Sequence, residues 1–210
     1  MDRSGFLLAY KRIRFRKNST MKVIGVTGTE QAVGTTHFSC MLGVFLSMVK
    51  GYKVAVVELC SPGSIRQAGR LFKRLNISRM KKALRIISLY TESDEIELSE
   101  VISMDYDYVI VDYGCNFDKY KKSYLMCPYK MVVGSLSWWR LQNYVTFVAK
   151  NSAEKSIKHW FFMATSPVKE GIRYLNQEFK IQIEEIPYEP DPFLLKNSLG
   201  FLHRISEKMF

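Results

Sequence analysis

Short apolar runs alternate along the chain with segments in which apolar positions recur every three or four residues. The runs lack polar alternation, which is typical of buried strands, and they cover residues 22–27, 53–59, 84–90, 108–111, 130–134, 159–164 and 181–186. The other segments have the spacing of amphipathic helices and cover residues 38–49, 65–75, 98–104, 141–151, 168–179 and 192–208. Buried strands separated by helices predict a parallel sheet covered on both faces. We therefore expect an α/β fold with three layers, α/β/α.

The pattern divides the 210 residues into three parts. Residues 1–20 are a basic N-terminal extension, residues 21–192 are a single domain, and residues 193–210 are a C-terminal amphipathic helix. The apolar patch Phe6–Tyr10 precedes the cations of the extension, which is the wrong order for a secretory signal. The longest nearly apolar stretch, Phe38–Val49, is shorter than the about 20 residues of a membrane-spanning helix. It predicts a buried helix.

The net charge indicates the class of partner, and the cysteine content indicates the redox compartment. The net charge of +11 favours an anionic partner, namely nucleic acid, anionic lipid or an acidic protein, although a basic solvated surface explains it equally well. The four cysteines are far apart and form no CxxC pair, so we expect reduced thiols in a cytoplasmic protein.

The segment between the first strand and the first helix carries the most specific motif. It reads TEQAVGTTH over residues 29–37, in the strand–loop–helix context that a P-loop requires. It resembles the deviant Walker A loop, GKGGVGKTT, of the MinD/ParA (SIMIBI) family of P-loop NTPases, which have a Rossmann-like fold. On this alignment Thr29 takes the place of the first glycine, and Glu30 and Thr35 replace the two lysines. Gly34 matches, and so does Thr36, the Mg²⁺-binding hydroxyl of the family.

The resemblance implies ATP and Mg²⁺ as ligands. The replacement of both lysines argues against ATP hydrolysis. In the family, the lysine at the Thr35 position bridges the β- and γ-phosphates, and the one at the Glu30 position reaches across a dimer. Charge stabilisation is most of what a protein contributes to phosphoryl transfer. We therefore expect no catalytic residue and, on balance, no enzyme. No productive binding, binding without hydrolysis and true ATPase activity all stay open.

Later segments follow the same family. Residues 106–112 resemble its Walker B strand, where Asp112 would hold Mg²⁺ through water or else cap the next turn. If nucleotide binds, the resemblance implies Thr29, Gly34, Thr35, Thr36 and Asp112 as its binding residues, with Thr36 and Asp112 at the metal.

Two further positions, Cys60 and Thr165, deviate from the family. Glu58 matches the first acid of the second strand, but Cys60 replaces the Asp that positions the attacking water. Thr165 stands where an Asn reads adenine. Residues 186–191, IPYEPD, resemble the IPYDP turn before the last helix.

The resemblance leaves several roles open. The chain looks most like the TadZ/CpaE proteins of pilus assembly, which implies a localisation scaffold with protein partners. It would be a homodimer through the P-loop face, with no small-molecule substrate beyond nucleotide. Alternatives are a ParA-like partition protein that binds DNA and an active MinD-like ATPase at the inner face of the membrane.

Two clusters of apolar residues bear on these roles. The last helix is either a lipid-binding tail, used in weak peripheral binding to anionic membranes, or a helix packed on the sheet. Trp138 and Trp139 are adjacent, so at least one is expected at an interface unless both pack in the core. Tyr113 is expected to fill space vacated by nucleotide.

Overall fold

A parallel sheet forms the centre of the protein. The structure is a computed structural model and describes residues 20–59, 65–67, 70 and 86–210. Within these residues the strands are β1 (Lys22–Gly28), β2 (Val54–Glu58), β3 (Ile87–Tyr90), β4 (Tyr108–Asp112), β5 (Tyr129–Gly134), β6 (Phe161–Ala164) and β7 (Ile183–Glu185). Their order in the sheet is β3-β2-β4-β1-β5-β6-β7, and every neighbouring pair is parallel. The predicted α/β class is confirmed.

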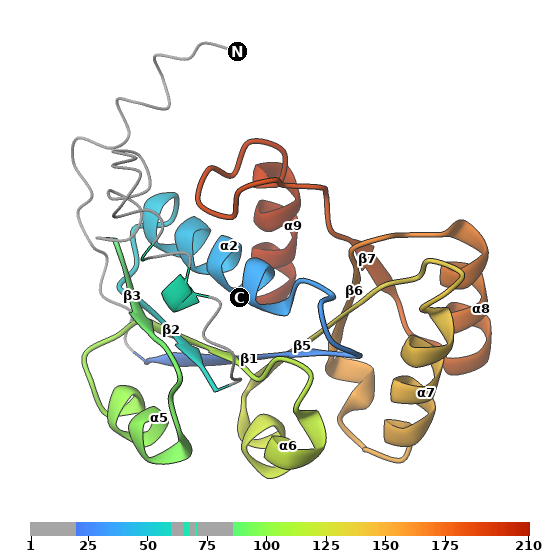
Figure 1. Ribbon diagram of the computed structural model, residues 1–210, viewed down its shortest axis with the longest axis horizontal. Helices are drawn as coiled ribbons and strands as arrows, with labels where there is room; N and C mark the ends of the chain where they lie inside the picture. Colours follow the sequence, from blue (N-terminus) through green and yellow to red (C-terminus); the bar gives the residue numbers. More distant parts are fainter. Residues whose placement is uncertain (1–19, 60–64, 68–69, 71–85) are drawn as a thin grey trace.

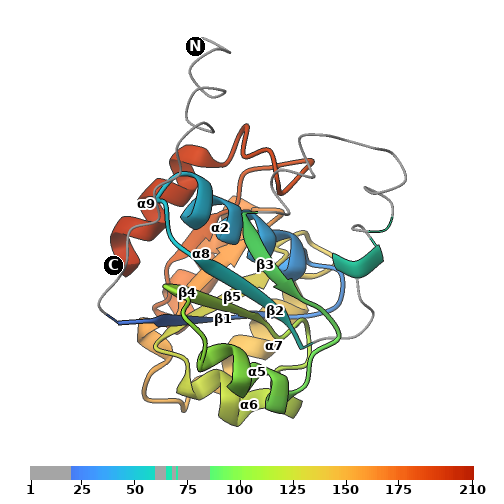
Figure 2. The ribbon, with the colours of Figure 1, turned by 90° about the vertical axis from the view of Figure 1, so that its left-hand side faces the viewer.

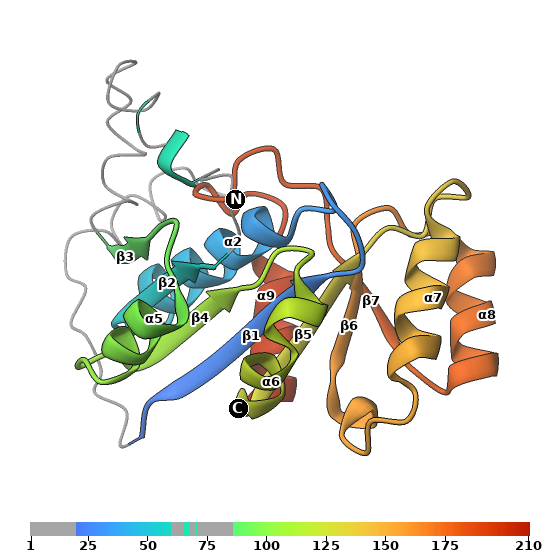
Figure 3. The same ribbon diagram turned by 60° about the horizontal axis from the view of Figure 1, so that its bottom comes forward.

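Helices cover both faces of the sheet, as Figures 1 and 2 show. One face carries α2 (Thr35–Met48) and α9 (Leu199–Met209). The other face carries α5 (Glu95–Ile102), α6 (Phe117–Met126), α7 (Leu141–Asn151) and α8 (Lys169–Phe179), which Figure 3 brings to the front. The 3₁₀ turn Ile157–His159 precedes β6.

Each face has its own hydrophobic core, and the strands supply the two cores in alternation. On β4, Tyr108 and Ile110 face α2, whereas Val109 and Val111 face the layer of α5 and α6. This is the period of two that extended backbone imposes on side chains. The direction of each residue near the carboxyl ends of the strands follows from it.

Helix α6 was absent from the pattern-based prediction. Its sequence is polar on average, and only Phe117, Tyr120 and Tyr124 are buried. These three aromatics recur at intervals of three and four residues and form edge-to-face and tilted pairs with each other or with Tyr113. The signal was present, but it lay in aromatic residues rather than in an aliphatic stripe.

The last helix is shorter than expected and begins at Leu199 rather than near residue 192. Leu195 has a positive φ of 49°, which interrupts helical geometry before that point. The apolar side of α9 packs on α2, where the rings of Phe201 and Phe38 lie 6.4 Å apart and Leu202 is fully buried. The alternative in which this helix packs within the fold is confirmed.

No helix in the described ranges is both long and apolar enough to cross a membrane. The extension of residues 1–19, and most of the helix predicted over 65–75, lie outside the described residues.

Candidate functional site: the phosphate-loop region

The loop that resembles a Walker A motif leaves the centre of the sheet at the end of β1 and leads directly into α2. Neighbouring strand ends hold its base. The Gly28 N–H donates to the Gly114 carbonyl at 2.6 Å, and the Thr29 N–H donates to the Val133 carbonyl at 2.9 Å. The loop therefore lies at the carboxyl edge of the sheet, where parallel α/β folds bind ligands.

The backbone conformation of the loop is one that can bind an anion. Ala32 and Gly34 adopt left-handed conformations with φ of 57° and 92°. Gly34 precedes α2 as its N-cap without any side-chain cap, and the first turn of α2 contains no acidic residue. The N–H groups of a first helical turn have no partner within their helix, and they attract phosphate. Thr36, half-buried, lies in this turn.

Thr35 does not project from this cradle. A β-carbon placed on Gly28 would lie 2.6 Å from Thr35 Oγ1, so the threonine side chain packs directly against the end of β1. Thr35 is 6% exposed. The residue that replaces the Walker lysine therefore fills space beneath the loop and supplies no charge to a ligand.

Thr29 is likewise directed into the protein. Its hydroxyl is buried and has no hydrogen-bond partner. It lies 2.6 Å from the position that a β-carbon on Gly134 would take. The Thr29 N–H also donates a hydrogen bond to the Val133 carbonyl of β5. Thr29 therefore holds the loop to β5.

Glu30, the residue at the other lysine position, is bound to α7 of the same chain. Its Oε2 accepts a hydrogen bond of 2.6 Å from Asn143 Nδ2, and its Oε1 lies 3.9 Å from Arg140 Nη1. Arg140 also donates to the carbonyl of Gln31 at 3.5 Å. The sign-reversed residue is thus neutralised locally. No sequence spacing indicated this partnership, because the residues are 113 positions apart.

Asp112 and Glu58 end adjacent strands and are paired in register. Both are fully buried. They alternate onto the face of α2, and their charges act on Cys40 of that helix. Burial raises the pKa of the Cys40 thiol far above its ordinary value, and the two carboxylates raise it further. Asp112 Oδ1 also accepts a 2.9 Å hydrogen bond from the Gly114 N–H, so the predicted turn-capping role is present.

Tyr113 corrects an expectation. It follows Asp112, so it points to the opposite face of the sheet and packs between α5 and α6. Its hydroxyl is 2.8 Å from Ser123 Oγ, and burial raises the pKa of Tyr113. It does not fill the nucleotide side of the loop, and the prediction that it would is wrong.

Two other residues, Thr165 and His37, meet the loop region. Thr165 follows β6, and its methyl carbon is the nearest atom to a β-carbon placed on Gly34, at 3.7 Å. His37, in the first turn of α2, donates a hydrogen bond to the Glu189 carbonyl. Burial lowers the pKa of His37, while that bond and the charges of Asp191 and Glu189 oppose the shift. The C-terminal turn is thereby joined to the start of α2.

The loop region fits a bound nucleotide only in part. The backbone cradle and the uncapped helix fit a phosphate group, but the described loop residues 29–36 contain no cation. Cys60 lies outside the described residues. Among the residues that the structure describes, no cluster of three His, Cys, Asp or Glu side chains is arranged to hold a metal ion.

Several solved structures share this fold. A putative plasmid partition protein from Borrelia burgdorferi B31 bound to AMPPNP is 15% identical, with a TM-score of 0.63 over 91% of this chain and 100% of that one. A chain of the MinC:MinD cell division protein complex from Aquifex aeolicus is 16% identical, with a TM-score of 0.62 over 89% of this chain and 96% of that one. This chain has the ParA/MinD fold. The pNOB8 ParA bound to nonspecific DNA is 12% identical, with a TM-score of 0.57 over 90% and 99%.

Sequence comparison adds no closer relationship, since no family model and no curated protein matches the chain. The fold resemblance that the Walker-like segments predicted is confirmed by the ParA/MinD structures. Contact with nucleotide remains a prediction for Thr29, Gly34, Thr35, Thr36 and Asp112. Identities of this size establish the fold alone.

Proposed function

We propose that this ParA/MinD-fold protein does not hydrolyse ATP, binds it weakly or not at all, and acts as a localisation or assembly scaffold of the TadZ/CpaE kind. The proposal rests on the contacts of Thr35 and Glu30, the residues at the two positions where the family has lysine. Thr35 is packed beneath the loop, and Glu30 is bound to Asn143. Neither residue can stabilise the negative charge that develops during phosphoryl transfer.

Weak nucleotide binding is compatible with the same geometry. The N–H groups at the start of α2 and the left-handed Gly34 would receive phosphate oxygens. Thr36 and Asp112 would hold Mg²⁺, the ion that the fold's nucleotide chemistry uses. A cradle of this kind positions phosphate without stabilising the transition state.

A partner surface lies beside the loop. Trp138 is 65% exposed and Trp139 is 95% exposed, and they immediately precede Arg140, which contacts the loop at Gln31. Exposed tryptophans are enriched among the residues that dominate protein interfaces. We propose that the loop and this tryptophan pair together bind a protein partner, including a second copy of the chain in a homodimer.

Calorimetric titration with ATP and Mg²⁺, combined with mass measurement by light scattering, tests the proposal. We expect a dissociation constant no tighter than about 0.1 mM, a weak interaction on the affinity scale. We also expect a mass that ATP does not change. Micromolar binding together with ATP-dependent dimerisation would indicate a working nucleotide switch instead.

A DNA-binding partition protein is the second candidate, and the net charge of +11 favours it. Phosphate contacts make such binding steeply dependent on salt. A duplex affinity that falls by about tenfold or more between 50 and 200 mM salt would support this candidate, because several counterions would be released. An affinity that barely changes would exclude it. Peripheral membrane binding through α9 is less favoured, because its apolar side is already packed against α2.

A further inference from the structure

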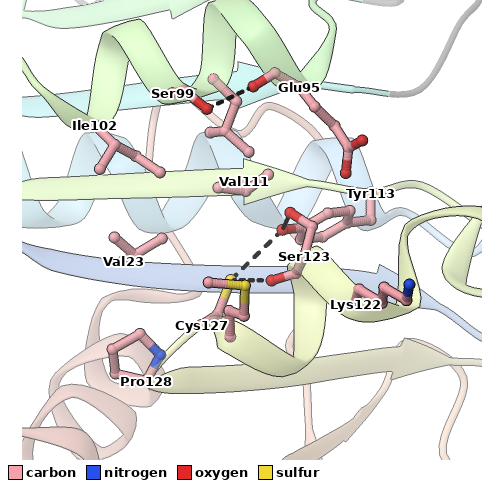
Figure 4. A pocket seen from close by; sticks show the side chains of 12 residues that line it. Val23, Glu95, Ser99, Ile102, Val111, Tyr113, Lys122, Ser123, Cys127 and Pro128 are labelled. Atoms are coloured by element: carbon pink, nitrogen blue, oxygen red, sulfur yellow. Dashed lines mark hydrogen bonds between the residues drawn. The ribbon is translucent and has the colours of Figure 1, made fainter.

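A groove of about 380 Å³ lies between α5 and α6, on the face of the sheet opposite α2. Val23 of β1 and Val111 of β4 form its floor, where the two helices leave the sheet uncovered (Figure 4). Its volume is within the range of ligand-binding pockets in proteins. Nothing in the proposed role of the P-loop uses this face, so a ligand of the groove would be additional to nucleotide.

One end of the groove is apolar. Ile102 of α5, Val23 and Pro128 lie toward this end (Figure 4). Met126 of α6 also lines the groove, and its side chain is 83% exposed. Covering apolar surface of this kind is favourable by about 25 cal/mol for each Å² removed from water. The apolar end therefore suits a hydrophobic side chain of a small ligand.

The other end of the groove carries one acid and one base. Figure 4 shows Glu95 of α5 on one side of Tyr113 and Lys122 of α6 on the other. Burial raises the pKa of Tyr113, and the charge of Glu95 contributes a smaller rise, so the carboxylate acts on this part of the groove. Neither Glu95 nor Lys122 forms an ion pair with any residue that the structure describes.

The opposite charges of Glu95 and Lys122 restrict the head group that this end can bind. A simple carboxylate is attracted by Lys122 and repelled by Glu95, and a simple ammonium group meets the reverse. A head group that carries both charges gains from both residues. The hydroxyl groups of Tyr113 and Ser123, 2.8 Å apart, are bonded to each other, so the charges decide the selection.

We propose that the groove binds a free α-amino acid with a large apolar side chain. Lys122 binds its carboxylate, Glu95 binds its ammonium group, and its side chain covers the apolar end toward Ile102. A peptide holds its two terminal charges at opposite ends of a chain, so only the free amino acid presents both at one end of the groove. Glu95 and Lys122 are exposed, so each charge contact is weak. We expect a dissociation constant of about 1–5 mM for L-phenylalanine.

Nuclear magnetic resonance of the full-length protein labelled with ¹³C at its methionine methyl groups tests this proposal. L-phenylalanine, added to about 20 mM, should shift the Met126 signal, which the Met126→Leu variant identifies. The signal of Met41, fully buried on the α2 face, should not move.

Three analogues of the probe, at matched ionic strength, separate its parts. Phenylalaninamide lacks the carboxylate, 3-phenylpropionate lacks the ammonium group, and L-alanine lacks the ring. Each should bind at least roughly threefold more weakly than L-phenylalanine, because each loses one of the three contacts.

Two matched variants of α5 assign the ammonium contact. Glu95→Gln should weaken L-phenylalanine binding by roughly threefold and remove its advantage over 3-phenylpropionate, because the variant neither attracts the ammonium group nor repels the carboxylate. Glu100→Gln removes the same charge from α5 outside the groove and should leave both affinities unchanged. An unmoved Met126 signal, equal affinity for L-phenylalanine and its analogues, or equal effects of Glu95→Gln and Glu100→Gln would each overturn the proposal.

Discussion

Asn143 Nδ2 donates a hydrogen bond of 2.6 Å to Glu30 Oε2, which fastens the phosphate loop to α7 of its own chain. In the family that the loop resembles, the residue at this position reaches across a dimer. Here the side chain is satisfied within the monomer. The loop is therefore held in place by contacts that need neither nucleotide nor a second subunit.

This contact should be measurable as a coupling between two positions. We expect Asn143→Ala and Glu30→Ala each to lower the free energy of unfolding by about 1 kcal/mol, a modest value because Asn143 is exposed. The double variant should cost less than the sum of the single ones. Urea unfolding of the four proteins measures the coupling, and strict additivity would show that the hydrogen bond contributes nothing.

Restoring a lysine should recover phosphate affinity. We expect Thr35→Lys to bind ATP about tenfold more tightly than the natural chain, equivalent to about 1.4 kcal/mol, because a cation joins the backbone cradle. Thr35→Val, which keeps the shape and adds no charge, is the control and should show no gain. Calorimetry measures both, and thermal melts confirm that each variant is folded. A folded Thr35→Lys protein without improved affinity would mean that the loop backbone no longer accepts phosphate.

Close packing between the loop and α7 should make Gly134 intolerant of a side chain. A β-carbon there would lie 2.4 Å from Tyr144 and 2.6 Å from Thr29. We expect Gly134→Ala to lower the free energy of unfolding by about 1–3 kcal/mol through overpacking.

Gly200 provides the matched control for this substitution. It lies in α9 with no heavy atom within 4 Å of its β-carbon position. Gly200→Ala should raise stability by about 0.5–1 kcal/mol, since alanine favours helix. Denaturant unfolding compares the two variants, and an equal effect at both positions would contradict the packing described for the loop.

The docking of α9 predicts a large effect at its buried centre. Leu202 is fully buried against the core that includes α2, so Leu202→Ala should cost about 2–5 kcal/mol. Arg204, on the exposed side of the same helix, makes a 3.5 Å ion pair with Glu184 and lies 5.8 Å from the centre of the Phe201 ring. Both contacts are exposed and weak, so Arg204→Ala should cost about 1 kcal/mol or less. A free lipid-binding tail would instead leave the stability in solution unchanged in both variants.

Sequence reasoning located most of the sheet because buried parallel strands are continuous apolar runs. The run over residues 108–111 predicted β4, and the helical spacing over residues 141–151 predicted α7 with the observed bounds. Helix α6 was missed because its average composition is polar and its buried face is aromatic. The start of α9 was placed too early, since the positive φ of Leu195 leaves no sequence signal.

The candidate site was predictable in its position but not in its contacts. The order of strand, loop and helix placed residues 29–37 at the carboxyl edge of the sheet. The directions of Thr35, Glu30 and Tyr113 depend on tertiary packing. Strand alternation could have excluded Tyr113 from the loop face, because it follows Asp112 directly. The pairing of Glu30 with α7 joins residues distant in sequence, which no local pattern records.

ATP turnover of the purified full-length protein, measured beside its Asp112→Ala variant with Mg²⁺ present, tests the central claim most directly. Both former lysine positions lack a charge that can stabilise the transition state, so we predict that phosphate release by the natural chain equals that of Asp112→Ala and of a protein-free blank. Turnover above the blank that disappears in Asp112→Ala would show that the site is a working ATPase and would contradict the account.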